Sequence, residues 1–124
     1  MPTARTAMYA QGSQIHIATW PGSVGLTKDI SRFIATEGRV FVVSVGAIYR
    51  AEHIPNDFPL REQMIGSGEH FYNGGSMIVA PTGEVLAGPV ADEETIVIAD
   101  LDLSLVAKER QNFDPTGHYS RPDV

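Results

Sequence analysis

Hydrophobic and polar positions alternate in two different periods along the first third of this chain. Residues 3–11 place Ala4, Ala7, Met8 and Gln11 at i, i+3, i+4 and i+7, which predicts a helix with a small, mostly apolar face. Residues 14–20 are rich in β-branched and aromatic side chains, which predicts a strand. The Pro-Gly pair that follows ends this strand.

The same alternation continues with a second helix and a second strand. Residues 27–37 place Ile30, Phe33 and Ile34 on one helical face, and Gly38 suits the helix end. Residues 39–45 form a nearly continuous apolar run, typical of a strand buried on both faces. The order helix, strand, helix, strand predicts an α/β protein with layered elements.

The second half of the chain is less regular. Residues 46–74 show no clear period beyond a helical turn near 60–64, which is typical of a functional or partner-contacting loop. Residues 76–80 and 84–87 flank Pro81-Thr82-Gly83, which predicts a β-hairpin. We further expect a strand at 95–99, a short helix at 103–111 and an extended tail from Phe113.

Composition narrows the class of protein. A chain of 124 residues with 43% hydrophobic and 19% charged residues predicts one globular domain at most. The net charge of −6 argues against nucleic-acid binding, and no apolar run approaches the roughly 18 residues of a membrane span. The first residues do not resemble a signal peptide, so we expect a cytoplasmic location. The absence of cysteine excludes disulfides, thiolate zinc sites and cysteine nucleophiles within this chain.

Few side chains suggest chemistry by their spacing alone. The four histidines do not show metal-ligand spacing, and we interpret His16 as a partly buried or interface residue rather than a ligand or general base. The acidic residues 92–94 are expected in a solvated turn, and residues 66–68 and 74–76 in loops rather than phosphate cradles. We therefore predict no metal site and no cofactor. Trp20, at the end of a strand, fits core filler and pocket wall equally well.

Several blocks of the sequence, in order, resemble nitrilases of the carbon–nitrogen hydrolase superfamily. They include Arg-Thr-Ala-Met-Tyr-Ala-Gln-Gly at residues 5–12 and Ile-His-Ile-Ala-Thr-Trp-Pro-Gly at 15–22. Further blocks are Ala-Thr-Glu-Gly-Arg-Val-Phe-Val-Val-Ser at 35–44, Gly-Ser-Met-Ile-Val-Ala-Pro-Thr-Gly-Glu-Val-Leu at 75–86, and Gly-His-Tyr-Ser-Arg-Pro-Asp-Val at 117–124. The resemblance covers essentially the whole chain.

This resemblance implies a reaction that the chain cannot perform by itself. Nitrilases hydrolyse a nitrile to a carboxylate and ammonia with a cysteine nucleophile, a glutamate base and a lysine. All three positions fall before the region that matches this chain, and neither Lys28 nor Glu37 corresponds to them. The resemblance assigns Thr19 and Trp20 to the wall of the substrate pocket.

The resemblance also implies a fold and a mode of assembly. Residues 1–124 would form a single partial domain, the carboxyl-terminal half of a four-layer α-β-β-α sandwich, with one mixed sheet and helices packed on one side. The inner face of that sheet would then be apolar and uncovered, with residues 40–45 inside any interface. We therefore expect a homo-oligomer or pairing with a missing amino-terminal half, with a small-molecule nitrile bound only in the complemented state.

The sequence leaves four functions open. The chain could be a catalytically silent part of a nitrilase, a subunit that complements a cysteine-carrying chain, or a module that caps nitrilase oligomers. A new enzyme that uses a local serine or histidine is the least favoured of the four.

Overall fold

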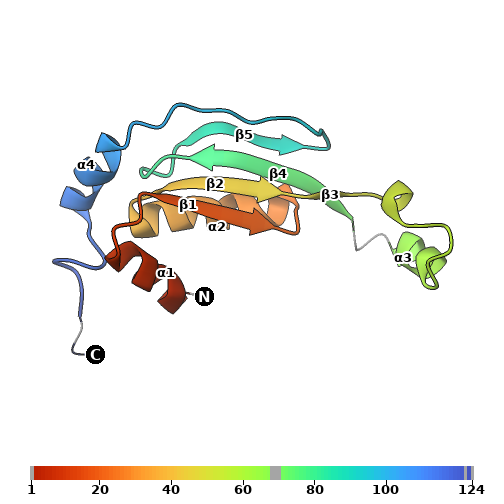
Figure 1. The fold of residues 1–124 in the computed structure, drawn as a ribbon, viewed down its shortest axis with the longest axis horizontal. Helices are drawn as coiled ribbons and strands as arrows, with labels where there is room; N and C mark the ends of the chain where they lie inside the picture. The colour runs from red at the N-terminus through yellow and green to blue at the C-terminus, as the bar shows by residue number, and fades with distance from the viewer. Residues whose placement is uncertain (1, 68–70, 122, 124) are drawn as a thin grey trace.

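The computed structural model describes residues 2–67, 71–121 and 123, and it arranges them around one mixed sheet (Figure 1). The elements follow in the order α1 (Pro2–Ala10), β1 (Ile15–Trp20), α2 (Val24–Gly38), β2 (Phe41–Gly46), β3 (Ile48–Tyr49), the 3₁₀ turn η1 (Ala51–His53), α3 (Arg61–Ser67), β4 (Tyr72–Val79), β5 (Val85–Ala91) and α4 (Ser104–Asn112). The predicted α/β class is confirmed.

The sheet is built from one parallel and several antiparallel pairings. β1 pairs with β2 in parallel through the α2 crossover, as a β-α-β unit requires. β4 runs antiparallel to both β2 and β3. The two pairings share one register, so β3 continues the line of β2 along β4. The predicted hairpin is confirmed, because β5 folds back along β4 after the turn at Pro81-Thr82-Gly83.

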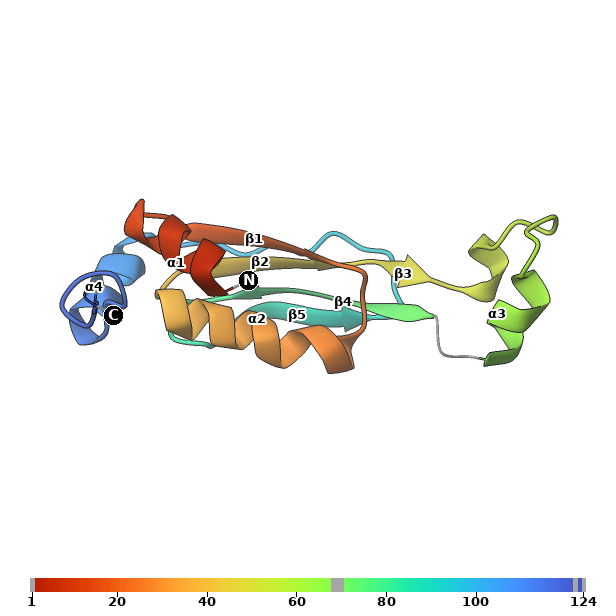
Figure 2. The same ribbon diagram turned by 90° about the horizontal axis from the view of Figure 1, so that it is seen from below.

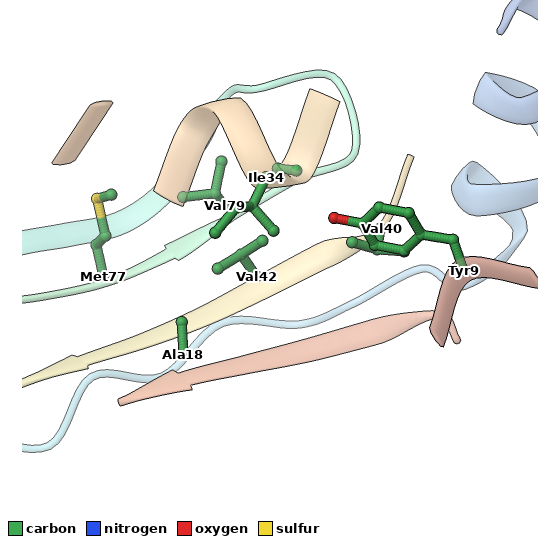
Figure 3. Close-up of a cluster of buried hydrophobic side chains, with 8 residues drawn as sticks. Tyr9, Ala18, Ile34, Val40, Val42, Met77 and Val79 are labelled. Carbon is green, nitrogen blue, oxygen red and sulfur yellow. The ribbon is translucent and has the colours of Figure 1, made fainter. Parts of the chain in front are cut away.

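The main core lies between α2 and one face of the sheet. Ile34 and Ala35 of α2 pack with Tyr9, Ala18, Val40, Val42, Met77 and Val79, most of which Figure 3 shows in close-up. Ser31 and Ser44 are also buried here, and each satisfies the other through a hydroxyl hydrogen bond of 3.2 Å.

One helical residue expected in the core is exposed. Phe33 is 53% exposed, whereas the buried positions of α2 are Thr27, Ser31, Ile34, Ala35 and Gly38. The buried stripe of α2 is therefore centred between Ser31 and Ile34 on the helix surface. Each residue of a helix is rotated by about 100° from the one before it, which places Phe33 outside this stripe.

Helix α4 covers part of the opposite face of the sheet. Val106 packs with Phe41 and Ala80 in a second, smaller core cluster. Beyond this cluster, β1 and β2 present apolar side chains to solvent, including Ile17 at 69% and Val45 at 48% exposure. Figure 2 shows α2 on one side of the sheet, and no helix of the described residues lies over the middle of the other side.

The strand predicted at residues 95–99 is wrong. This segment is extended but has no ladder partner among the described residues, so it forms no strand. We name residues 93–101 the strap, because they run along the sheet from β5 towards α4 (Figure 1). A β-rich sequence becomes a strand only when another strand satisfies its backbone groups.

The prediction of an extended tail from Phe113 is also wrong for the described residues. Residues 115–119 form turns rather than an extended segment. Asp114 causes the difference, because its carboxylate accepts hydrogen bonds from the Thr116 amide at 3.0 Å and hydroxyl at 3.1 Å. Three features named from the sequence fall wholly or partly outside the described residues. They are the last residue of the glycine-rich block at 66–68, His70, and residues 122 and 124 of the final block.

Residues 50–67, which follow β3, project from the body as an arm (Figures 1 and 2). It contains η1 and α3, and its only buried hydrophobic residue among those described is Ile54. The predicted helical turn near 60–64 is confirmed by α3, which begins at Arg61. No helix in the described part of the chain is long and apolar enough to cross a membrane.

Candidate functional site

The structure places Thr19 and Trp20 at the carboxyl end of β1, on opposite faces of the sheet. Thr19 pairs with Val45 and is exposed on the face away from α2. Trp20 pairs with Gly46 and lies partly buried against the main core. The Trp20 indole Nε1 is shielded from solvent and has no hydrogen-bond partner among the described residues.

The turn after Trp20 requires glycine. Gly22 has φ of 130°, and a Cβ at this position would overlap the carbonyl oxygen of Ala47 and lie 2.8 Å from Cβ of Tyr72. Ser23 follows with φ of 108°, a conformation that is costly for a residue with a Cβ. The chain therefore crosses closely over the start of β3 before α2 begins.

The amino end of α2 is capped from a distant part of the sequence. Ser23 provides no side-chain cap. Instead, the Val24 amide donates a hydrogen bond of 3.1 Å to Oδ1 of Asn73, and the Ser23 amide donates one of 2.8 Å to the Gly74 carbonyl. A Cβ on Gly75 would lie 2.9 Å from the Thr27 hydroxyl oxygen, so the start of β4 packs directly on the first turn of α2.

We call this region the β1–α2 junction and define it as residues 19–24 together with 73–76. Its functional groups are hydroxyl, amide and indole groups near the positive end of the α2 dipole. Such groups can hydrogen-bond a polar ligand and orient it. Within these described residues there is no carboxylate, imidazole or thiol side chain, so the hydroxyl groups of the junction have no general base inside it.

His16 lies in the middle of β1, away from this junction. Burial lowers the pKa of His16, and the positive charge of Arg5 lowers it further. Its Nδ1 atom is shielded and has no hydrogen-bond partner among the described residues. These observations agree with the interpretation of His16 as a partly buried histidine.

A polar network near His16 fastens α1 to α2. The Arg5 guanidinium and the Tyr9 hydroxyl both donate to Oε2 of Glu37, at 3.0 and 3.1 Å. Burial raises the pKa of Tyr9 to about 12, and the Glu37 charge adds to the shift. The Tyr9 ring lies over Gly38, where a Cβ would overlap it. This network has a structural role, because every member is already paired.

The remaining candidates contribute no second site. Residues 92–94 are exposed, as a solvated turn predicts, and the described residues contain no group of three or more potential metal ligands. A depression of about 480 Å³ lies on the arm, far along the chain from the junction, and is lined by Asn56, Phe58, Pro59, Leu60, Arg61, Glu62 and Gln63.

The sequence did not predict the role of Asn73 and of the glycines beside it in capping α2. Asn is a common helix cap, and an Asn-Gly-Gly run is a visible signal of an unusual backbone. The capped helix begins 49 residues earlier in the chain, however, so no local rule could connect the two.

Comparison with known proteins decides the family. The profile of the carbon-nitrogen hydrolase family matches residues 1–111. The chain belongs to the carbon-nitrogen hydrolase family. The chain is 39% identical over 128 residues to the bifunctional nitrilase/nitrile hydratase NIT4A of Lupinus angustifolius. It is also 40% identical over 129 residues to nitrilase 1 of Arabidopsis thaliana.

The extent of these matches matters as much as their identity. Each alignment covers 100% of this chain but only 37% of the relative, so the chain spans less than two-fifths of the relatives' length. The crystal structure of a carbon-nitrogen hydrolase from Helicobacter pylori G27 matches with a TM-score of 0.71 and 20% identity. That match covers 100% of this chain and 44% of the solved one, and it confirms the nitrilase-type fold.

Proposed function

We propose that this chain provides the carboxyl-terminal half of a nitrilase-type hydrolase and is inactive alone. The supporting observation is the family match over residues 1–111 in a chain that contains no cysteine. The reaction that this half would serve is the hydrolysis of a nitrile to a carboxylate and ammonia. A segment outside this chain would supply the cysteine, glutamate and lysine.

In this proposal the β1–α2 junction forms part of the substrate pocket. The pocket would open at the carboxyl end of β1, where ligands commonly bind in α/β sheets. Trp20 supplies an apolar wall with a shielded Nε1 donor that has no partner among the described residues, and Thr19 supplies a hydroxyl group on the other face. Asn73 and Gly22 hold this wall in place without taking part in the chemistry.

A complementing role is the second candidate, and the uncovered sheet face favours it. A separate chain could supply the three catalytic residues and cover the apolar side chains of β1 and β2. Mixing this chain with the cysteine-carrying segment of an intact nitrilase tests both candidates. Complementation predicts ammonia release that neither part shows alone, and a stable complex without turnover would leave only the scaffold role.

Substitution of Trp20, the only tryptophan in the chain, offers a second test of the pocket assignment. In a complemented enzyme, Trp20→Ala should raise KM or lower kcat by roughly tenfold or more, the cost of about 1.4 kcal/mol of lost contacts. Trp20→Phe should retain most activity. A matched change at an exposed aromatic residue of α2, Phe33→Ala, should leave both constants unchanged. Unaltered kinetics for Trp20→Ala would contradict the assignment.

A further inference from the structure

Asn73 is followed by Gly74, and this pairing makes an asparagine chemically unstable. The chain contains three asparagines, and the residues that follow them are Asp57, Gly74 and Phe113. An asparagine side chain is short enough to reach the backbone nitrogen of the next residue, and glycine has no Cβ to hinder that approach. Asparagine is accordingly counted among the thermolabile residues. Of the three asparagines, Asn73 therefore has the least hindered neighbouring nitrogen.

The reaction open to this pair is an intramolecular attack followed by hydrolysis. The Gly74 nitrogen loses its proton and bonds to the side-chain carbonyl carbon (Cγ) of Asn73, and the Cγ–Nδ2 bond breaks to release ammonia. Water then opens the cyclic imide at one of its two carbonyl groups. One product is aspartate with the normal backbone. The other is isoaspartate, whose backbone runs through the former side chain and is one methylene longer.

The folded chain holds both reacting groups with other partners. Oδ1 of Asn73 accepts the Val24 amide at 3.1 Å, and the Gly74 amide donates to the Ala47 carbonyl at 3.1 Å. The Asn73 carbonyl also accepts the Asp92 amide at 2.8 Å, so the backbone is fixed on its other side as well. Gly74 is buried. Its nitrogen cannot lose a proton while it donates to a carbonyl, so the reaction requires these hydrogen bonds to open.

We propose that Asn73 is a self-modification site, a deamidation site that the β1–α2 junction keeps closed and that reacts when this junction opens. The rate in the native chain is then the rate in the unfolded chain multiplied by the fraction of molecules in which the Gly74 amide is free. The reaction occurs once per chain and does not depend on the proposed nitrile hydrolysis. It therefore cannot be mistaken for turnover of a nitrile.

Deamidation makes an opening of the junction permanent. The aspartate product keeps an oxygen acceptor at the amino end of α2 and adds a negative charge there, which the helix dipole favours. The isoaspartate product lengthens β4 by one methylene at the residue that pairs with Ile48 and accepts from the Asp92 amide. This change breaks the register of β4 with β3 and removes the cap of α2. A chain with isoaspartate at this position cannot close the junction again.

Peptide mass spectrometry of aged samples tests this proposal. The native chain and the chain unfolded in guanidinium chloride are incubated at the same pH and temperature. In the unfolded chain, Asn73 should convert to aspartate and isoaspartate well before Asn56 and Asn112 do. In the native chain, Asn73 should convert more slowly by roughly tenfold or more. Both rates should rise with pH, because the attacking nitrogen must lose its proton.

Val24→Pro tests the closed junction in the folded chain. Val24 is the first residue of α2, where proline is tolerated, and proline lacks the amide that donates to Asn73. The native-state rate should therefore rise by roughly fivefold or more. Val24→Ala, the matched control, keeps the amide and should leave the rate unchanged. If Val24→Pro does not fold, the hydrogen-exchange protection of the wild-type Gly74 amide should equal the ratio of the unfolded to the native deamidation rate.

Several results would overturn the proposal. Equal rates in the native and unfolded chains, or equal rates for folded Val24→Pro and Val24→Ala, would exclude control by the junction. An Asn73 that converts no faster than Asn56 and Asn112 in the unfolded chain would exclude the site itself. Gly74→Val is measured in guanidinium chloride, where folding plays no part, and its branched side chain should slow the attack. An unchanged rate for Gly74→Val would contradict attack by the Gly74 nitrogen.

Discussion

Individual residues at the β1–α2 junction are constrained by backbone contact more than by their own chemistry. Gly22 and Gly75 both have positive φ, and each faces neighbouring backbone or side-chain atoms where a Cβ would need to lie. The junction therefore depends on glycine to bring β1, α2 and β4 together.

Gly22→Ala should destabilise the chain strongly. The new Cβ would overlap the Ala47 carbonyl, and the alanine would have to adopt a φ of 130°. We therefore expect the free energy of unfolding to fall by about 2–4 kcal/mol. Urea denaturation measures this loss. Gly66→Ala is the control, because a Cβ there meets no atom within 4 Å. Equal stabilities of the two variants would contradict the close crossing.

The Tyr9 hydroxyl should make stability depend on pH in the alkaline range. Its pKa rises from the ordinary value of 10 to about 12 in the folded chain, so the folded state holds the proton more tightly than the unfolded state. The resulting stabilisation is complete below pH 10 and is lost as the pH rises through about 12.

Tyr9→Phe tests this linkage. Wild type should be more stable than Tyr9→Phe near pH 8, by about 1 kcal/mol for the lost hydrogen bond to Glu37, and this advantage should shrink between pH 10 and 12. Urea denaturation over that range measures it. Tyr119→Phe, at a tyrosine that is 58% exposed, should show no such change. A constant difference across the range would refute the role of Tyr9.

At the scale of elements, the amino end of α2 depends on β4. Asn73→Ala removes the oxygen that accepts from the Val24 amide and should cost about 1 kcal/mol of stability. Asn73→Asp keeps an acceptor and adds a negative charge near the helix amino end, so it should retain most of that stability. Thermal or urea unfolding distinguishes the two, with exposed Asn56→Ala as the control. Equal losses for Ala and Asp would exclude the cap.

The elements that could be predicted from the sequence are those whose signals are local. The period of residues 27–37 predicted α2, and Pro81-Thr82-Gly83 predicted the β4–β5 hairpin, because each depends on neighbours within a few residues. Residues 95–99 have the composition of a strand, but strand formation depends on a partner that the described chain does not provide. The Asn73 cap likewise depends on a contact across 49 residues.

For the site, the sequence could identify residue types but not their orientation. Thr19 and Trp20 are adjacent, and only the register of β1 with β2 shows that they face opposite sides of the sheet. Their assignment to a substrate pocket stays a prediction. It rests on the family resemblance and on the position of the junction at the carboxyl end of β1.

At the scale of the whole molecule, the chain has the fold of its family but lacks the cysteine nucleophile of a nitrilase. The chain belongs to the carbon-nitrogen hydrolase family and shares the fold of a solved carbon-nitrogen hydrolase over its whole length. It has no cysteine, and it spans 37% of the length of related nitrilases. The proposed function follows from this combination: the chain contributes structure to a nitrile-hydrolysing site whose reactive groups lie elsewhere.

Ammonia release by the purified chain alone tests this central claim most directly. The substrates should include aliphatic, aromatic and arylacetonitrile compounds, with intact nitrilase 1 of Arabidopsis thaliana as the positive control, and amide products should be measured in parallel. The account predicts no ammonia or amide above the rate in buffer. Clear turnover by a chain without cysteine would contradict it and would require a nucleophile from the residues present.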